Sequence, residues 1–125
     1  MLRFGPHALP REQIFYETVH ALAITNLRPV LPGHVLVLSR RAVARFGDLS
    51  AAEAADVWCA AQAVGRVVTA CHGGTSATYS LQDGAEAGQS VPHLHIHIVP
   101  RRAADLPCND DVYDLLEASR SEGVV

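Results

Sequence analysis

A chain of 125 residues with 49% apolar residues has the length and composition of one globular domain, which we expect to span residues 1–125. The formal net charge of −3 argues against binding to a nucleic-acid polymer. No apolar run is long enough to span a bilayer, and the first residues lack a signal-peptide core. We therefore expect no membrane association and a cytoplasmic location, with the nucleus as a further option in a eukaryote.

The cysteine and lysine contents restrict the chemistry. The three scattered cysteines form no CxxC pair, which suits a reducing compartment, although a catalytic role for Cys108 stays open at this stage. The chain contains no lysine, so Schiff bases and lysyl–nucleotide intermediates are excluded.

Hydrophobic runs of strand length, bounded by turn residues, predict most of the secondary structure. The first twelve residues carry little pattern and are first interpreted as an edge segment. Strands are expected over Ile14–Thr18, Ala21–Thr25, His34–Ser39, Thr75–Gln82 and His93–Val99. The loop Asp83–Ser90 precedes the last of these strands.

Two helices are expected. Ser50 and Glu53 form a capping box, and apolar residues then recur at spacings of three and four as far as Gly73-Gly74, which predicts one long helix. A short helix is expected from Asn109 onward, because its first turn is acidic. Strands joined by tight turns pair antiparallel, so the fold class is α+β, with the long helix on one face of an antiparallel sheet.

The segment between Pro92 and Pro100 alternates histidine with aliphatic residues. Successive side chains of a strand point to opposite faces, so His93, His95 and His97 share one face. The two prolines are expected to mark the ends of the strand. We expect the face that carries the histidines to be the one that the long helix leaves uncovered.

Three interpretations of these histidines compete. A shared zinc ion fits poorly, because the outer two positions are ~13 Å apart and zinc–nitrogen bonds are only about 2.1 Å long. No metal site is therefore expected, although His34 stays a conceivable further ligand. A purely structural role is improbable for three histidines in register beside a polar loop, and stays open only for His93.

The third interpretation is nucleophilic catalysis at phosphorus. A neutral imidazole attacks a phosphate, and a second imidazole supplies a proton to the leaving group. The loop ending in Gly88-Gln89-Ser90 offers close backbone approach, an amide and a hydroxyl, and Gln82 offers another amide. These groups bind phosphate without adding charge.

The segment His93–Val99 matches the alternating signature of the histidine triad (HIT) superfamily. Further segments between residues 3 and 118 resemble the fragile histidine triad branch of dinucleoside polyphosphate hydrolases: Arg3-Phe4-Gly5, Asn26, Pro32–Val37, Arg45-Phe46, Asp48-Leu49, Gln82–Gly84, Glu86–Gln89 and Pro100-Arg101. The resemblance implies a HIT-like fold, with a five-stranded antiparallel sheet, one long helix and a short C-terminal helix. It also implies hydrolysis of diadenosine triphosphate to AMP and ADP through a nucleotidyl-histidine intermediate.

The same resemblance assigns roles to individual residues. His95 would be the nucleophile, and His97 would contact phosphate oxygens. His93 and His34 would orient the network. Gln82 would aid the leaving group, and Gln89 and Ser90 would contact the phosphates. Asn26 would bind the ribose, and Phe4 and Leu9 would line the adenine site.

The partners implied are a small nucleotide and a second copy of the chain, joined through the long helix and a strand in a homodimer. No tightly bound cofactor is expected, and Mg²⁺ or Mn²⁺ would enter only with the substrate phosphates. Two other functions stay open: a purine nucleoside phosphoramidase of the same superfamily, and a nucleotide-binding sensor without turnover.

Overall fold

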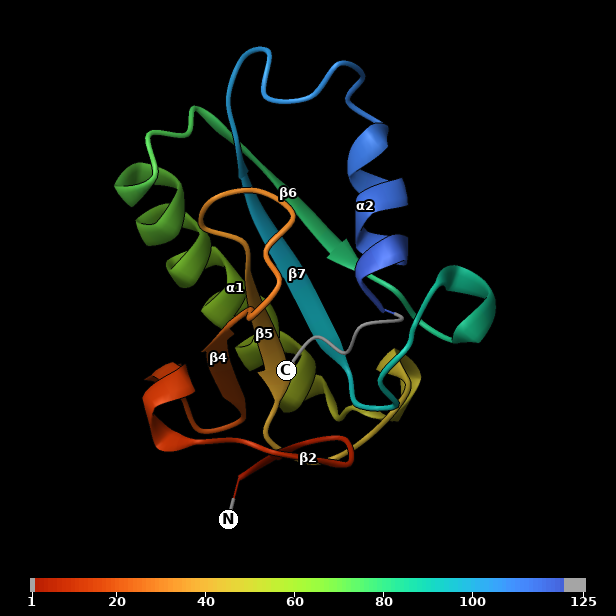
Figure 1. Ribbon diagram of the computed structural model, residues 1–125. Helices are drawn as coiled ribbons and strands as arrows, with labels where there is room; N and C mark the ends of the chain where they lie inside the picture. The colour runs from red at the N-terminus through yellow and green to blue at the C-terminus, as the bar shows by residue number, and fades with distance from the viewer. Residues whose placement is uncertain (1, 121–125) are drawn as a thin grey trace.

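The computed structural model describes residues 2–120, with side chains as far as residue 117. Its centre is a five-stranded antiparallel sheet of order β3-β4-β5-β7-β6 (Figure 1). The strands are β3 (Ile14–Glu17), β4 (Ala21–Thr25), β5 (Val35–Ser39), β6 (Ser76–Leu81) and β7 (His95–Arg101). The predicted sheet and both predicted helices, α1 (Ala51–Cys71) and α2 (Asp111–Arg120), are confirmed.

Helix α1 begins at the capping box that the sequence predicts. The hydroxyl of Ser50 accepts a hydrogen bond from the N–H of Glu53, and the Glu53 carboxylate accepts one from the N–H of Ser50. The buried stripe of α1 packs on Ile96 and Ile98, on the aliphatic face of β7, and on Leu94 just before that strand. The histidine face is therefore the one that α1 leaves uncovered, as predicted. Within residues 2–120, no helix is both long and apolar enough to cross a membrane.

Other segments cover the histidine face. The first residues form a hairpin of two short strands, β1 (Arg3–Phe4) and β2 (His7–Ala8), rather than a plain edge segment. Phe4 and Leu9 from this region pack with Leu36 and Leu38 of β5. At the other end of the same face, α2 packs against Val99 of β7. His95 of β7 thus contacts Phe4 of the hairpin, and Val99 farther along the same strand contacts α2. Figure 1 shows where the hairpin and α2 lie relative to β7.

The limits of β7 differ from the prediction. His93 and Leu94 precede the strand, which begins at His95 and continues through Pro100 to Arg101. Pro100 is tolerated inside the strand because the pairing with β5 ends at Ile98. The C=O of Arg101 points toward β6 and accepts from Thr75, so the nitrogen of Pro100 points to the other side, beyond the end of β5. No ladder hydrogen bond is lost there.

Candidate active site

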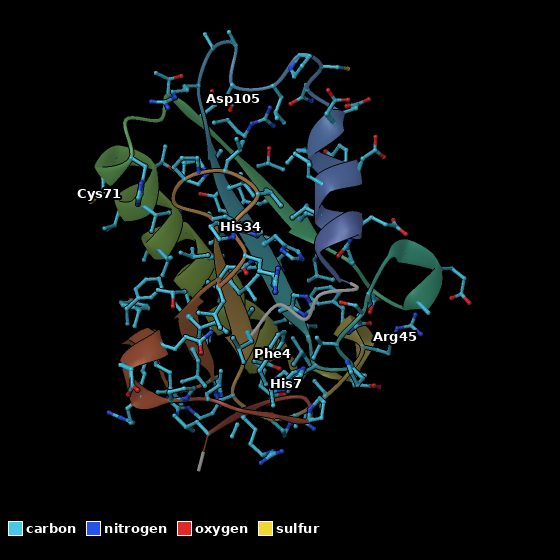
Figure 2. The ribbon with its side chains drawn as sticks, in the orientation of Figure 1. Phe4, His7, His34, Arg45, Cys71 and Asp105 are labelled. Atoms are coloured by element: carbon cyan, nitrogen blue, oxygen red, sulfur yellow. The ribbon has the colours of Figure 1, made fainter. Side chains whose placement is uncertain are left out.

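Four histidines from three segments meet on the uncovered face of the sheet. His95 and His97 lie on β7, His93 lies just before it, and His34 immediately precedes β5. Each side chain is at most 3% exposed. Figure 2 shows His34 near the middle of the molecule and Phe4 nearer the end that carries the hairpin. The antiparallel pairing of β5 with β7 thus brings together His34 and His97, which are 63 residues apart in the sequence.

His93 uses both of its ring nitrogens for structure. Nδ1 accepts a hydrogen bond from the N–H of Gly5 (2.9 Å), and Nε2 donates to the C=O of Ser39 (2.5 Å). This pattern requires a neutral ring with its proton on Nε2. His93 therefore ties the β1–β2 hairpin to the end of β5 and presents no free nitrogen to a substrate.

A chain of hydrogen bonds sets the tautomers of His34 and His97. The N–H of Val30 donates to Nδ1 of His34 (3.1 Å), so the proton of His34 lies on Nε2. That Nε2 donates to Nδ1 of His97 (3.0 Å). The proton of His97 must then lie on its Nε2, which makes that nitrogen a hydrogen-bond donor toward the open side of the site.

His95 has the opposite tautomer. Its Nδ1 donates to the C=O of His93 (2.8 Å), so Nε2 carries the lone pair. Nε2 makes no hydrogen bond to a residue in the described part of the chain. Two neighbouring rings pack edge-on against the His95 ring: Phe4 at a centroid distance of 4.9 Å and an interplanar angle of 86°, and His97 at 5.1 Å and 71°.

Burial keeps all four imidazoles neutral near pH 7. Loss of solvation lowers the pKa of His95 to about 4, against a weaker opposing effect of its hydrogen bond to His93. Burial, with the charge of His95 as a smaller cause, lowers the pKa of His34 to about 4. The pKa of His97 also lies well below its usual value, first because of burial and then because of His95 and His34. The lone pair on His95 is therefore available at neutral pH.

Gln82 lies just after β6 and beside the loop that was predicted to bind phosphate. A Cβ atom built on Gly88 would lie 2.6 Å from Nε2 of Gln82, and Gly88 has a φ of +97°. Glycine is thus required here both for the backbone conformation and for the close approach of the amide. The side chain of Gln82 makes no hydrogen bond within the described residues, so its amide is available to a ligand.

The loop of residues 83–90 is held in place by its own side chains. Gln89 accepts from the N–H of Gly84 (2.8 Å) and donates to the C=O groups of Ala44 (2.8 Å) and Val91 (3.1 Å). Asp83 accepts from Arg45 (3.0 Å) and from the N–H of Phe46. The amide of Gln89 is thus fully engaged in shaping the loop, and its contact with phosphate stays a prediction.

The other predicted substrate contacts differ in exposure and in the groups they touch. Ser90 is exposed at the end of the loop, and Phe4 and Leu9 are buried, Phe4 completely. The amide nitrogen of Asn26 lies 3.3 Å from each ring nitrogen of His34, and its oxygen accepts from the N–H of Arg28 (3.0 Å). Asn26 therefore steadies His34, and its contact with a ribose stays a prediction, as do those of Ser90, Phe4 and Leu9.

Sequence reasoning missed the backbone groups of the site. Three backbone groups fix the tautomers of His34 and His93: the N–H of Val30, the N–H of Gly5 and the C=O of Ser39. No side-chain pattern in the sequence predicts these contacts. Of these residues, only Gly5 could have been singled out from the sequence, because it belongs to the Arg3-Phe4-Gly5 segment that resembles the fragile histidine triad branch. Among the described residues, no three His, Cys, Asp or Glu side chains are grouped as ligands of a metal ion.

Comparison with known proteins shows the family. The HIT domain model matches residues 10–104. A protein of Arabidopsis thaliana named bifunctional bis(5'-adenosyl)-triphosphatase/adenylylsulfatase FHIT is 48% identical over 95% of this chain and 66% of its own length. A bis(5'-adenosyl)-triphosphatase of Dictyostelium discoideum is 44% identical over 94% of this chain and 78% of its own length. The chain thus spans about two thirds to four fifths of these relatives.

Solved structures agree with the sequence comparison. The Caenorhabditis elegans NitFhit protein matches 96% of this chain and 29% of its own, at 44% identity and a TM-score of 0.82. The diadenosine triphosphate hydrolase of Plasmodium falciparum matches 98% of this chain and 85% of its own, at 27% identity and a TM-score of 0.81. The chain belongs to the HIT domain family and, within it, to the fragile histidine triad branch.

Proposed function

We propose that the protein hydrolyses dinucleoside polyphosphates, with diadenosine triphosphate cleaved to AMP and ADP. One observation carries this proposal: of the eight ring nitrogens in the four histidines, only Nε2 of His95 is left with a lone pair free for attack. Relatives named bis(5'-adenosyl)-triphosphatase support the choice of substrate.

The first step forms a nucleotidyl-histidine. Nε2 of His95 attacks the α-phosphorus, a P–N bond forms, and the P–O bond to the departing nucleotide breaks. The Nε2–H of His97 donates to a phosphate oxygen, and the free amide of Gln82 and the hydroxyl of Ser90 hold the phosphate chain. The departing phosphate is a weak base at neutral pH and leaves as an anion.

In the second step, water attacks the same phosphorus from the side that the first nucleotide has left. The P–N bond breaks, AMP is released, and Nε2 of His95 regains its lone pair. The proton of the attacking water goes to solvent. The Nδ1–H bond of His95 to the C=O of His93 supports the positive charge that the ring carries while it is nucleotidylated.

The expected divalent cation is part of the substrate in this proposal. Mg²⁺ or Mn²⁺ would arrive bound to the polyphosphate and would need no ligand from the protein. No other tightly bound cofactor takes part in the two steps.

We also propose that the protein acts as a homodimer. In the described sheet, β6 is an edge strand whose outer side pairs with no described strand. Trp58 on α1 is 39% exposed and Tyr79 on β6 is 42% exposed, and the Tyr79 ring packs over Gly65 of α1. Sedimentation equilibrium should give twice the chain mass, and Trp58→Glu should shift the population toward the monomer. A monomeric wild-type protein at micromolar concentration would contradict the dimer.

A substrate panel tests the activity. Diadenosine triphosphate, diadenosine tetraphosphate and adenosine phosphoramidate are offered to the wild type and to His95→Asn, and the products are separated by chromatography. We expect the triphosphate to yield AMP and ADP, and His95→Asn to bind nucleotide without turnover. Preference for the phosphoramidate would indicate a phosphoramidase. Binding without turnover by the wild type would indicate a sensor.

The intermediate is tested separately. Brief mixing with substrate labelled at the α-phosphorus, followed by denaturation, should leave acid-labile label on His95. A fully active enzyme that never carries label would point to direct attack by water.

A further inference from the structure

A cavity of about 300 Å³ lies at the opposite end of β7 from His95. Its walls come from three segments: the C-terminal end of α1 with His72 and Gly74, the loop with Leu31 and Pro32, and residues 100–105 after β7. Figure 2 shows Asp105 and Cys71 at this end of the molecule, away from Phe4 and His7. No residue of the histidine triad lines the cavity.

The single acidic group of the cavity is already neutralised. The carboxylate of Asp105 accepts from Nε (2.8 Å) and Nη2 (3.0 Å) of Arg101 and from the N–H of Arg102 (3.0 Å). The Arg101 guanidinium lowers the pKa of Asp105 to about 2. The remaining Arg101 nitrogen, Nη1, donates to Thr78 and Asn109, so this ion pair has little capacity left for a ligand.

Two basic side chains, on two different walls of the cavity, have no partner among the described residues. The guanidinium of Arg102 and the ring of His72 are exposed, and neither makes a hydrogen bond or ion pair with a residue between 2 and 120. A Cβ built on Gly73 would lie 4.0 Å from Nη1 of Arg102, which places the guanidinium beside the end of α1. The cavity therefore has unneutralised positive charge above a wall of Leu31, Pro32 and Pro100.

The turn that carries Arg102 is strained. It is closed by the N–H of Asp105, which donates to the C=O of Arg102 (3.2 Å), and Ala104 inside it has a φ of +62°. Ala104 is the one non-glycine residue with positive φ among those described. The conformation costs an alanine about 1 kcal/mol. Such strain is concentrated at sites that hold ligands.

We propose that this cavity is a second binding site, for a small anion that carries a phosphate group. A guanidinium presents paired N–H donors that match phosphate oxygens, and the His72 ring supplies a further donor. The volume is at the lower limit of ligand pockets, which suits inorganic phosphate or a small phosphate monoester. The lining contains no triad residue, so both sites accept ligands at the same time.

The test is a titration of the full chain, labelled with nitrogen-15, with inorganic phosphate and, separately, with ribose 5-phosphate. Saturating shifts of the amides of Gly74, Ala103 and Ala104 are expected with at least one of the two compounds. The compound that binds with the higher affinity shows whether the ligand is free phosphate or a phosphate monoester. Arg102→Ala should weaken this binding at least tenfold. Adding His72→Ala to that variant should weaken the binding further. Arg66→Ala is the matched control, because Arg66 is an exposed arginine of α1 that does not line the cavity.

The active site also binds phosphate under the proposed function, so the amides of Ser90 and His97 serve as separate reporters. Their response should be the same in Arg102→Ala as in the wild type. The second site is disproved if the cavity amides shift linearly or not at all with both compounds. It is equally disproved if Arg102→Ala and Arg66→Ala give the same affinity at those amides.

Discussion

The Nε2 atom of His34 lies 3.0 Å from Nδ1 of His97 and donates its proton there. The N–H of Val30 donates to Nδ1 of His34, so the proton of His34 must lie on Nε2. This sets the direction of the hydrogen bond to His97. A backbone N–H thus determines which nitrogen of His97 faces the substrate as a donor. His34 acts through His97 and is a positioning residue.

Replacement of His34 separates positioning from simple packing. His34→Ala removes the donor and should lower kcat about 100-fold, the lower end of what a positioned proton donor contributes, with a smaller change in KM. His34→Gln keeps an N–H donor near Nδ1 of His97 and should recover part of this loss. Nitrogen-15 spectra should show the His97 proton on Nε2 in the wild type and in His34→Gln. Equal kcat values for the two variants would contradict the positioning role.

Gly88 offers a test with a matched control. Gly88→Ala places a Cβ atom 2.6 Å from Nε2 of Gln82 and forces alanine to a φ of +97°, so we expect a loss of about 1–3 kcal/mol in unfolding free energy. Displacement of the Gln82 amide should also raise KM for the dinucleotide. Gly47→Ala meets no atom within 4 Å, and it should change stability by less than about 0.5 kcal/mol and leave KM unchanged. Similar effects of the two substitutions would disprove the assigned contact.

The buried histidines make stability depend on pH. Their unfolded pKa is 6.5, whereas those of His34 and His95 are about 4 in the folded protein. Between these values the unfolded chain binds more protons, so the unfolding free energy should fall as the pH falls from 6.5 to 4. Each of these two histidines contributes roughly 3 kcal/mol to this loss.

Urea unfolding at a series of pH values measures this dependence. The slope should be close to zero above pH 7 and steep between pH 6 and pH 4. His95→Asn should reduce the slope in that window by about 1.4 kcal/mol per pH unit. Carboxylates with lowered pKa values add to the slope at the acidic end of this range and below it: Glu53, whose unfolded value is 4.5, and then Asp56, Asp83 and Asp105, whose unfolded value is 3.8. A wild-type protein with no slope above pH 4 would refute the neutral, buried state of the histidines.

The N-cap of α1 is tested by Ser50→Ala. The substitution removes the acceptor for the N–H of Glu53 and should cost about 1 kcal/mol of stability. Activity at low temperature should be retained, because Ser50 lies outside the site. Ser76→Ala, at the exposed start of β6, is the control and should be nearly neutral. A Ser50→Ala protein as stable as this control would show that the cap is dispensable.

The side-chain pattern was enough to predict the elements whose periodicity is strong. The alternation of His95, Ile96, His97 and Ile98 correctly predicted a strand with one histidine face, and Ser50 with Glu53 correctly predicted the start of α1. The predicted end of β7 was wrong. Pro100 is harmless inside the strand only because β5 has already ended there, and this depends on the register of the two strands and not on the local sequence.

The tautomers of the site could not be predicted at all. They depend on where the N–H groups of Gly5 and Val30 and the C=O of Ser39 lie in space, and every non-proline residue has the same two backbone groups. The hairpin β1–β2 was also missed as structure, because two-residue strands have no periodicity to detect. Its role as a cover over the histidines follows only from the packing of Phe4 on His95.

The opposed tautomers of His95 and His97 also determine how the protein should respond to covalent probes. A reagent that alkylates or phosphorylates imidazole needs an unprotonated nitrogen that is not already an acceptor. His34 and His93 have none, and the exposed-side nitrogen of His97 carries a proton, so Nε2 of His95 is the one target among the four rings. Within this site, a phosphorus-centred inhibitor should thus modify a single nitrogen, Nε2 of His95.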